Sequence, residues 1–245
     1  MKITFFGTSH GKPEPHRKRS SAMVEIGENR YIIDIGTDIT EPLITRAIPF
    51  DSLRAIFITH MHTDHTNGLI PFVGLCRDSS YKIADPMIFL PGDIEKTVEA
   101  MNAWMLCNGT PITRDYRYMP VSEGALYDDG TLRVTAFRTR HTNESYAYLL
   151  EAEGKRVLFS GDLSHLGPTE PFLVSLVQTP LDLAICECAH FEGTDYLPLF
   201  EKNEHVRRLY INHYSARRLP SVLALKNALT HMECTLASDD MEIVV

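Results

Sequence analysis

Short apolar runs separated by turn residues recur along the chain, and several of them end at a residue type that can bind a metal ion. The runs that predict strands span residues 55–58, 132–137, 156–160, 183–186 and 208–212. Apolar residues at helical spacing predict a helix over 93–105, and cap and proline residues place further helix starts near residues 66, 171 and 219. Strands that alternate with helices indicate the α/β class.

The length and composition of the chain are consistent with one domain. Its 245 residues are 44% hydrophobic, which is enough for one large domain with a substantial core over residues 1–245. Two β/α halves are expected to meet near residues 120–130, where glycine and acidic residues punctuate short strands. No apolar stretch reaches the ~18 residues of a membrane span, and the chain begins directly with a strand. Five cysteines, an odd number, are expected to be reduced thiols, so we expect a cytoplasmic protein with no membrane partner.

The densest chemistry follows the 55–58 strand, in the sequence His60-Met61-His62-Thr63-Asp64-His65. Four of these six residues are metal-ligand types within one turn. Alternate side chains of a tight turn point apart, so His60 and His62 can bind one ion while Asp64 and His65 reach a second. Imidazoles and carboxylates without thiolates suit zinc, with manganese and iron as alternatives. The motif therefore predicts two divalent metal ions.

Three more candidate ligands follow predicted strands elsewhere in the chain. His141 lies shortly after the 132–137 strand, Asp162 follows Gly161 after the 156–160 strand, and His213 follows the 208–212 strand. Each alone has an ordinary structural interpretation, because an Asp after Gly is typical of a turn and a lone His is often a packed one. Together they indicate a site, since the carboxyl ends of strands can converge on one cleft. Asp162 is the natural bridge between the ions.

This constellation resembles the signature of the metallo-β-lactamase superfamily, an H-x-H-x-D-H motif followed by a distant His, an Asp and a final His. The resemblance implies an α/β fold, the αββα four-layer sandwich, and a hydrolase. It assigns His60, His62, His141 and Asp162 to the first metal ion, and Asp64, His65, His213 and Asp162 to the second. Asp64 is also expected to act in catalysis.

The amino-terminal region resembles the branch of ribonuclease Z and the cyclic phosphodiesterases, on residues 2–8, 20–21 and 31–36. By that resemblance Asp34 would orient the ligand loop through hydrogen bonds, although a capped strand end is an equal alternative. Residues 212–217 resemble the H-[FY]-S-x-R segment of ribonuclease Z. Residues 200–205, however, do not match its His-Ser-Thr segment, and the stretch from Asp162 to Leu183 is too short for an arm that grips transfer RNA.

The stretch Glu187-Cys188-Ala189-His190 resembles the Asp/Glu-Cys-Ser/Ala-His segment of phosphonate-pathway cyclic phosphodiesterases. That resemblance nominates His190 as the catalytic proton carrier, with a packing histidine as the alternative. The formal charge of −8 argues against broad affinity for polynucleotides. Residues 12–19 nevertheless form a basic loop that could receive a phosphate, although charge runs are usually solvated surface.

These features predict a binuclear metal-dependent hydrolase that activates water between two ions. We expect a phosphodiesterase acting on a small or cyclic phosphodiester. The sequence itself is silent on oligomeric state, although a homodimer is common among the relatives that the resemblance indicates. The alternatives are a lactone or thioester hydrolase using the same metal site, and a ribonuclease Z-like endonuclease acting at RNA 3′ ends. A diiron redox protein is disfavoured, because that pattern would carry Glu at the position of His62, and an idle relative would have lost ligands.

Overall fold

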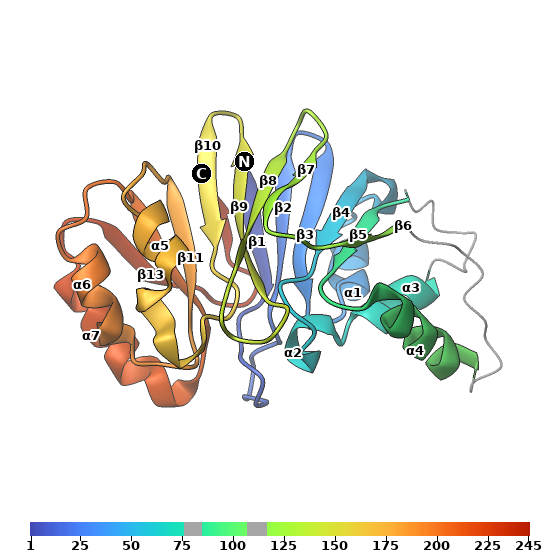
Figure 1. The fold of residues 1–245 in the computed structure, drawn as a ribbon, viewed down its shortest axis with the longest axis horizontal. Coiled ribbons are helices and arrows are strands. Elements are labelled where there is room, and N and C mark those ends of the chain that lie inside the picture. Colours follow the sequence, from blue (N-terminus) through green and yellow to red (C-terminus); the bar gives the residue numbers. More distant parts are fainter. Residues whose placement is uncertain (76–84, 107–116) are drawn as a thin grey trace.

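The computed structural model describes residues 1–75, 85–106 and 117–245, and in these residues two seven-stranded β-sheets lie face to face (Figure 1). Helices cover the outer face of each sheet, so the layers run helix, sheet, sheet, helix (Figure 1). The αββα sandwich expected from the sequence is therefore confirmed. The boundary between the two halves falls between the strands that end at Pro120 and begin at Gly124, within the predicted range.

The first sheet has the strand order β14-β1-β2-β3-β4-β5-β6. Its strands are β1 Lys2–Gly7, β2 Ser21–Ile26, β3 Asn29–Ile35, β4 Leu53–Phe57, β5 Met87–Leu90, β6 Arg117–Pro120 and β14 Glu242–Val244. Strands β3 to β6 are parallel, whereas β14, β1, β2 and β3 pair in antiparallel fashion. The helices of this half are α1 Thr40–Thr45, α2 Thr63–Thr66, α3 Leu69–Leu75 and α4 Ile94–Leu106, with the 3-10 helix η1 Phe50–Ser52.

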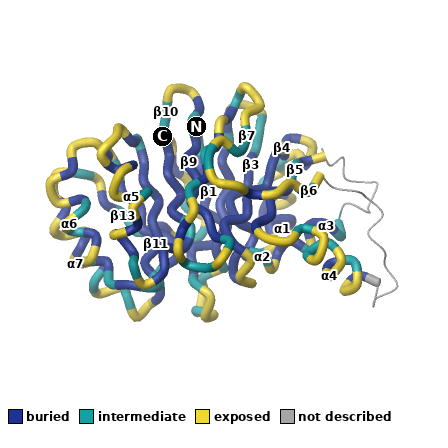
Figure 2. Tube along the Cα trace, viewed as in Figure 1, coloured by how far each residue is buried: buried dark blue, intermediate teal, exposed yellow. Residues whose placement is uncertain are grey.

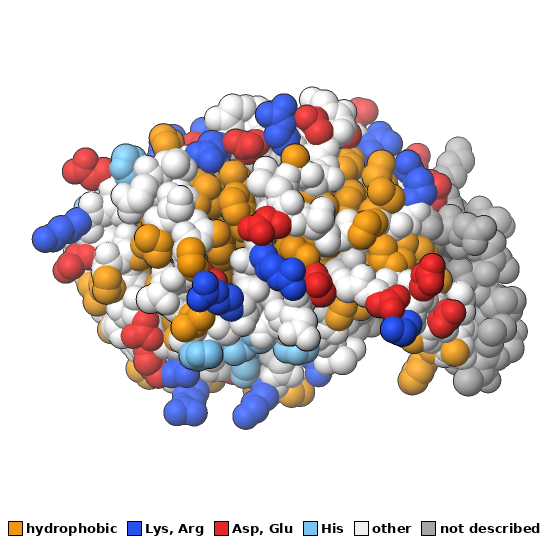
Figure 3. Space-filling model, in the orientation of Figure 1, with side chains coloured by type: hydrophobic (Ala, Val, Ile, Leu, Met, Phe, Trp, Pro, Cys, Tyr) orange, Lys and Arg blue, Asp and Glu red, His pale blue; other side chains and the backbone are white. Residues whose placement is uncertain are grey.

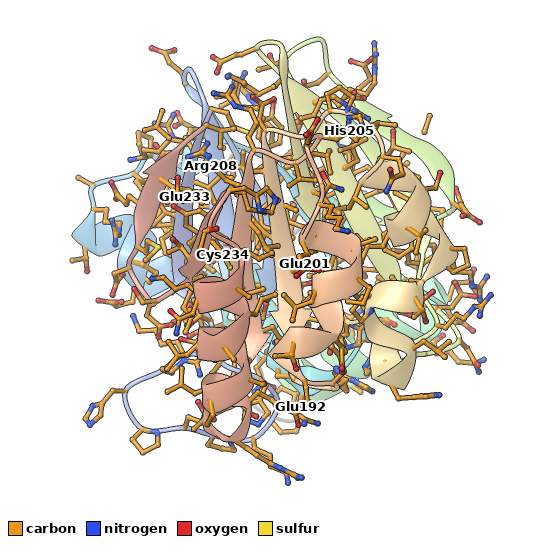
Figure 4. All side chains as sticks on the ribbon, turned by 90° about the vertical axis from the view of Figure 1, so that its left-hand side faces the viewer. Glu192, Glu201, His205, Arg208, Glu233 and Cys234 are labelled. Atoms are coloured by element: carbon orange, nitrogen blue, oxygen red, sulfur yellow. The ribbon has the colours of Figure 1, made fainter. Side chains whose placement is uncertain are left out.

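The second sheet has the strand order β13-β12-β11-β10-β9-β8-β7. Its strands are β7 Gly124–Asp128, β8 Arg133–Arg138, β9 Tyr146–Ala152, β10 Lys155–Phe159, β11 Leu183–Cys188, β12 Arg208–Tyr214 and β13 Glu233–Leu236. Strands β10 to β13 are parallel to one another. Helices α5 Pro171–Leu176, α6 Leu197–Phe200 and α7 Leu219–Ala228 lie side by side over this sheet (Figure 4), accompanied by η2 Ser164–Thr169, η3 Gly193–Tyr196 and η4 Ala216–Arg218.

Three hydrophobic clusters fill the three spaces between the layers. Along β3, Tyr31 and Ile33 point into the cluster between the sheets, while Ile32 points into the cluster under α1, α3 and α4. Successive residues of a strand face opposite sides, so a strand covered on both faces is apolar throughout. Figure 2 shows the central strands buried along most of their length. The continuous apolar runs of the sequence are explained by this double covering.

One predicted boundary is wrong, and it matters for the site. The helix expected to open near residue 66 is observed as α3, which begins at Leu69, but it is preceded by a separate turn that was not expected, α2 from Thr63, formed by the ligand motif itself. The predicted 93–105 helix is observed as α4, and Asp93 Oδ1 accepts a hydrogen bond from the Lys96 amide at 3.1 Å as a cap would. In the described residues no helix is long and apolar enough to cross a membrane. Cys186, Cys188 and Cys234 are free and buried, while Cys76 and Cys107 lie outside the described residues.

Candidate metal centre

The seven predicted metal ligands converge at one edge of the sandwich, where strands of both sheets end. The first sheet contributes four of them, from the end of β4 and from α2, and the second sheet contributes three, after β8, after β10 and within β12. The four are His60, His62, Asp64 and His65, and the three are His141, Asp162 and His213. In Figure 3 histidine side chains reach the surface along the lower edge of the molecule, with Lys and Arg side chains projecting below them. The site therefore lies on the seam between the two halves.

One group of donor atoms has the spacing of a tetrahedral metal site. His62 Nδ1 lies 3.0 Å from His60 Nε2 and 3.1 Å from His141 Nε2. Asp162 Oδ2 lies 3.7 Å from His60 Nε2 and 3.6 Å from His141 Nε2. Ligands at about 2.0–2.1 Å from one tetrahedral ion are themselves separated by about 3.3 Å. This group therefore has the separations that a single divalent ion requires.

A second group lies beside the first and shares Asp162 with it. His65 Nε2 lies 3.5 Å from both Asp64 Oδ2 and Asp162 Oδ1. His213 Nε2 lies 3.7 Å from Asp64 Oδ2 and 3.3 Å from Asp162 Oδ2. The structure therefore brings the seven residues together around the Asp162 carboxylate, and the division of the ligands between two ions stays a prediction.

The chemistry of the donor atoms also fits divalent cations. His65 Nε2 and Asp162 Oδ1 are buried and have no hydrogen-bond partner, which costs free energy unless a cation is bound there. Burial lowers the pKa of His60 to about 2, assisted by the charge of His65, so its imidazole is neutral and can donate a lone pair. Burial acts to raise the pKa of Asp162, but His213 and His65 hold it well below its ordinary value. His60 and Asp162 are thus in the protonation states that metal binding needs.

Asp34 makes the hydrogen bonds expected of a residue that orients the ligand loop. His65 Nδ1 donates a hydrogen bond to Asp34 Oδ2 at 2.7 Å. The proton of the neutral ring is therefore on Nδ1, and the lone pair of Nε2 is free to bind a cation. The Thr59 amide and hydroxyl also donate to Asp34, at 2.7 Å to Oδ1 and 2.9 Å to Oδ2. Gly36 allows this close packing, because a Cβ there would lie 1.7 Å from the Asp64 carbonyl oxygen.

His190 lies at the open side of the site and is held by Glu187. Its Nδ1 donates to Glu187 Oε1 at 2.8 Å, and its Nε2 lies 3.9 Å from Asp162 Oδ2. Burial acts to lower the pKa of His190, but the hydrogen bond and charge of Glu187 outweigh it and raise the pKa. Glu187 also accepts the amide hydrogen of Leu163 at 2.7 Å, next to Asp162. One buried carboxylate therefore fixes both His190 and the chain that carries the shared ligand.

Sequence reasoning missed several residues at this site. Thr59 and Glu187 act through hydrogen bonds across 25 and 24 positions of sequence, a separation that no local pattern reveals. His10 lies near Asp64 and His213, and burial lowers its pKa. Its one sequence signal is its place before Gly11, in the turn after β1. The basic loop of residues 12–19 is also partly internal, since the Arg17 side chain is 17% exposed.

The fold and the two donor groups define the class of protein: the metallo-β-lactamase superfamily of hydrolases, in its ribonuclease Z-like branch. A family model described as Anti-Pycsar protein Apyc1 matches residues 1–226. The chain therefore belongs to the Anti-Pycsar protein Apyc1 family.

Curated relatives and solved structures agree with this placement. The chain is 31% identical to ribonuclease BN of Cronobacter sakazakii over 159 residues, 63% of this chain and 51% of that protein. It is 27% identical to ribonuclease Z of Bradyrhizobium diazoefficiens over 181 residues, 72% of this chain and 58% of that protein. The chain thus spans about half the length of the curated relatives it matches.

Three solved structures share the fold at low sequence identity. The metallo-β-lactamase fold protein YhfI of Bacillus subtilis has a TM-score of 0.76 at 17% identity, over 99% of this chain and 98% of that one. The short form of human tRNase Z has a TM-score of 0.70 at 22% identity, over 100% and 99%. A diphosphatase of the PhnP family has a TM-score of 0.71 at 18% identity, over 100% and 97%.

Proposed function

We propose that the chain is a binuclear metal-dependent phosphodiesterase that hydrolyses a small or cyclic phosphodiester, with zinc as the metal. The observation that carries the proposal is the pair of donor groups joined by Asp162, with the His190–Glu187 pair beside them. When bound, two divalent cations supply a water of lowered pKa and neutralise the charge of a phosphodiester.

The burial of the donors indicates the side from which a substrate approaches. His60, Asp64, His65, Asp162 and His213 are buried. In contrast, His62 is exposed, and His141 and His190 are half-buried. A phosphodiester that enters past these three residues meets His190 at the rim of the site. The chain's own contribution is to hold the donors in fixed positions and to keep water from the buried side.

His190 is positioned to give a proton to the leaving oxygen. Because Nδ1 donates to Glu187, Nε2 is the ring atom that faces Asp162 and the cleft. A positioned general acid contributes typically about 10²–10⁴ to the rate, most when the leaving group is a poor one. Glu187 acts as a positioning residue, since it contacts His190 and the Leu163 amide.

A small substrate is favoured over a polynucleotide by the chain around the site. Residues between β10 and β11 fold as η2 and α5, and Leu173, Leu176 and Val177 pack into the core under the outer helices. That stretch therefore packs against the core and does not extend from the surface as an arm that could bind RNA. The charge of −8 also disfavours a polyanion. The second candidate, cleavage at RNA 3′ ends, is supported by the names ribonuclease Z and ribonuclease BN of the relatives.

The decisive experiment compares substrates and one variant. Zinc-loaded protein is assayed on bis(p-nitrophenyl) phosphate, a 2′,3′-cyclic nucleotide, a transfer RNA precursor, a lactone and a thioester. We expect turnover of the first two. We also expect His190→Ala to keep its metal content while losing about 10²–10⁴ in kcat on the cyclic nucleotide and much less on the p-nitrophenyl ester.

The matched control is His205→Ala, because His205 is an exposed histidine (Figure 4) that lies before the start of β12, whereas the ligand His213 lies near the other end of that strand. This control should keep full activity on both phosphodiesters. Turnover of the lactone or thioester alone would overturn the phosphodiesterase assignment while leaving the metal site in place. Turnover of the RNA precursor alone would select the second candidate. Equal losses for His190→Ala on both phosphodiesters would remove the proton-donor role.

A further inference from the structure

Arg17 joins the loop after β1 to the strand that carries His213. Its Nη1 donates to the Tyr214 carbonyl oxygen at 2.8 Å and to Glu14 Oε2 at 2.6 Å, and its Nη2 donates to the Thr8 carbonyl oxygen at 2.5 Å. The guanidinium carbon also lies 3.9 Å from the centroid of the Tyr214 ring. A planar guanidinium suits this arrangement, because it can fork between acceptors and stack on an aromatic ring at once.

The same loop is also bonded to two residues that follow Tyr214, namely Ala216 and Asp239. Glu14 Oε1 accepts the Ala216 amide hydrogen at 2.5 Å, just after Tyr214. The Thr8 amide and hydroxyl donate to Asp239 Oδ1 at 2.9 and 2.7 Å, and the Lys18 amide donates to Asp239 Oδ2 at 2.5 Å. The loop over residues 8–20 is therefore held in place by several hydrogen bonds, including three from the Arg17 side chain.

The backbone at His213 needs such support. Its φ of 46° is in the left-handed region, which costs a residue other than glycine about 1–3 kcal/mol unless the surroundings impose it. The pairing of β11 with β12 shifts here, since Glu187 pairs with Asn212 and Cys188 pairs with Tyr214. His213 is thus the extra residue of a bulge, a device that re-aims a side chain and leaves a residue out of the strand ladder. Arg17 binds the first carbonyl after this bulge.

The loop also lies against the other carboxylate of the second donor group. A Cβ on Gly11 would lie 3.3 Å from Asp64 Oδ2, so the loop backbone packs directly on the Asp64 side chain. Asp64 and His213 are two of the three ligands, with His65, that belong to the second group alone. One loop, held by one arginine, therefore packs on Asp64 and is bonded to the residue that follows His213.

We propose that Arg17 is a positioning residue for the second metal ion, because its fork holds the Tyr214 carbonyl and thereby keeps the bulged His213 imidazole beside Asp64 and Asp162. The inference rests on the proposed function only in requiring that two ions bind. The basic loop then supports the metal ligands through internal hydrogen bonds. Arg17 is engaged in these bonds and is not one of the side chains that could receive a phosphate.

The chain offers a closely matched control in Arg46. Arg46 also forks between acceptors, here two carboxylates, Glu242 at 2.6 Å and Asp240 at 2.8 Å, and its guanidinium carbon lies 5.9 Å from the centroid of the Phe6 ring. It ties the same carboxyl-terminal segment to the body of the protein but contacts no ligand. Arg17→Ala and Arg46→Ala therefore remove similar interactions at different distances from the metal centre.

The experiment measures zinc binding separately from folding. Metal content is determined for the purified full chain, and the two zinc affinities are measured by competition with a chromophoric chelator. Thermal unfolding is followed in excess chelator. We expect Arg17→Ala to lower the affinity for the second zinc ion about 10–100-fold and to leave the affinity for the first unchanged. A loss of this size is typical when a residue that hydrogen-bonds behind a metal ligand is removed. Arg46→Ala should change thermal unfolding only.

Arg17→Lys separates charge from geometry and covers the case in which Arg17→Ala does not fold. Lysine keeps the charge over Tyr214 but cannot fork between the carbonyls of Thr8 and Tyr214, so the second ion should remain weakly bound. Second-ion affinity within twofold of the wild type in these variants would overturn the inference, as would an equal loss in Arg46→Ala. A wild-type chain that binds fewer than two ions would overturn the binuclear function as well, which distinguishes the two failures.

Discussion

Asp34→Asn is the substitution that tests the metal centre most directly. Asp34 has a φ of 57°, a conformation that asparagine tolerates well, so the backbone should be preserved. Its two carboxylate oxygens accept from the Thr59 amide and from His65 Nδ1, both at 2.7 Å. An asparagine can keep its oxygen on Thr59 only by presenting its NH₂ group to His65 Nδ1.

That rearrangement would force His65 into the wrong tautomer. With Nδ1 as an acceptor, the proton moves to Nε2, which is the atom 3.5 Å from both Asp64 Oδ2 and Asp162 Oδ1. A protonated Nε2 cannot bind a cation. Loss of such an orienting partner weakens metal binding about 10–100-fold, or about 1.4–2.8 kcal/mol. The first donor group, which does not include His65, should keep its affinity.

The assay is zinc competition against a chromophoric chelator, with metal content measured on the same samples. Asp129→Asn is the control, because Asp129 accepts four hydrogen bonds at the β7–β8 hairpin, from Tyr31, Tyr127, Thr131 and Leu132. This hairpin precedes β8, whereas the ligand His141 follows the other end of that strand. Two ions bound to Asp34→Asn at wild-type affinity would refute the tautomer argument. Loss of both ions equally would show that Asp34 supports the whole ligand loop and not His65 alone.

Three further outcomes are expected. Stripping the metal with chelator should lower the melting temperature, and zinc at a hundredfold excess over its Kd should restore about 2.7 kcal/mol of stability; an unchanged melting temperature would contradict a bound ion. Gly36→Ala should cost at least about 2 kcal/mol in urea unfolding, because its Cβ would lie 1.7 Å from the Asp64 carbonyl oxygen. Gly74→Ala, whose Cβ would meet Met105 Cε at 3.5 Å and no other described side chain, or backbone outside its own helix, within 4 Å, should be neutral or slightly stabilising. Burial acts to raise the pKa of Asp129, but hydrogen bonds from Tyr31 and from the Leu132 and Thr131 amides hold it below its ordinary value. Its contribution to stability is therefore present above about pH 4 and lost as the pH falls through the lowered pKa, and Asp129→Asn should flatten that part of the stability curve measured against pH.

The sequence predicts the strands, and the structure brings the seven candidate donor residues together at their ends, for a physical reason. Strands covered on both faces leave continuous apolar runs, and the ligands follow those runs directly, so each ligand could be placed at a strand end. The start of α2 at Thr63 was missed because the cap position is taken by His62, a ligand and not a usual capping residue.

The parts that the sequence does not predict are contacts between distant segments. Arg17 and Tyr214 are 197 positions apart, and Arg17 looks like any other member of a charged run. Glu187 was visible only as part of a resemblance to other proteins, although its hydrogen bonds to Leu163 and His190 make it central to the site. The bulge at His213 depends on how β12 pairs with β11, which no local pattern specifies.

The division of the ligands between the two sheets has a mechanical consequence. Because the Asp162 carboxylate lies within reach of His60 and His65 from one half and His141 and His213 from the other, coordination bonds would fasten the sheets together at this edge. Pulling the halves apart from that end would have to rupture those bonds before the apolar interior opens. Demetallated protein should accordingly yield at lower force in single-molecule stretching.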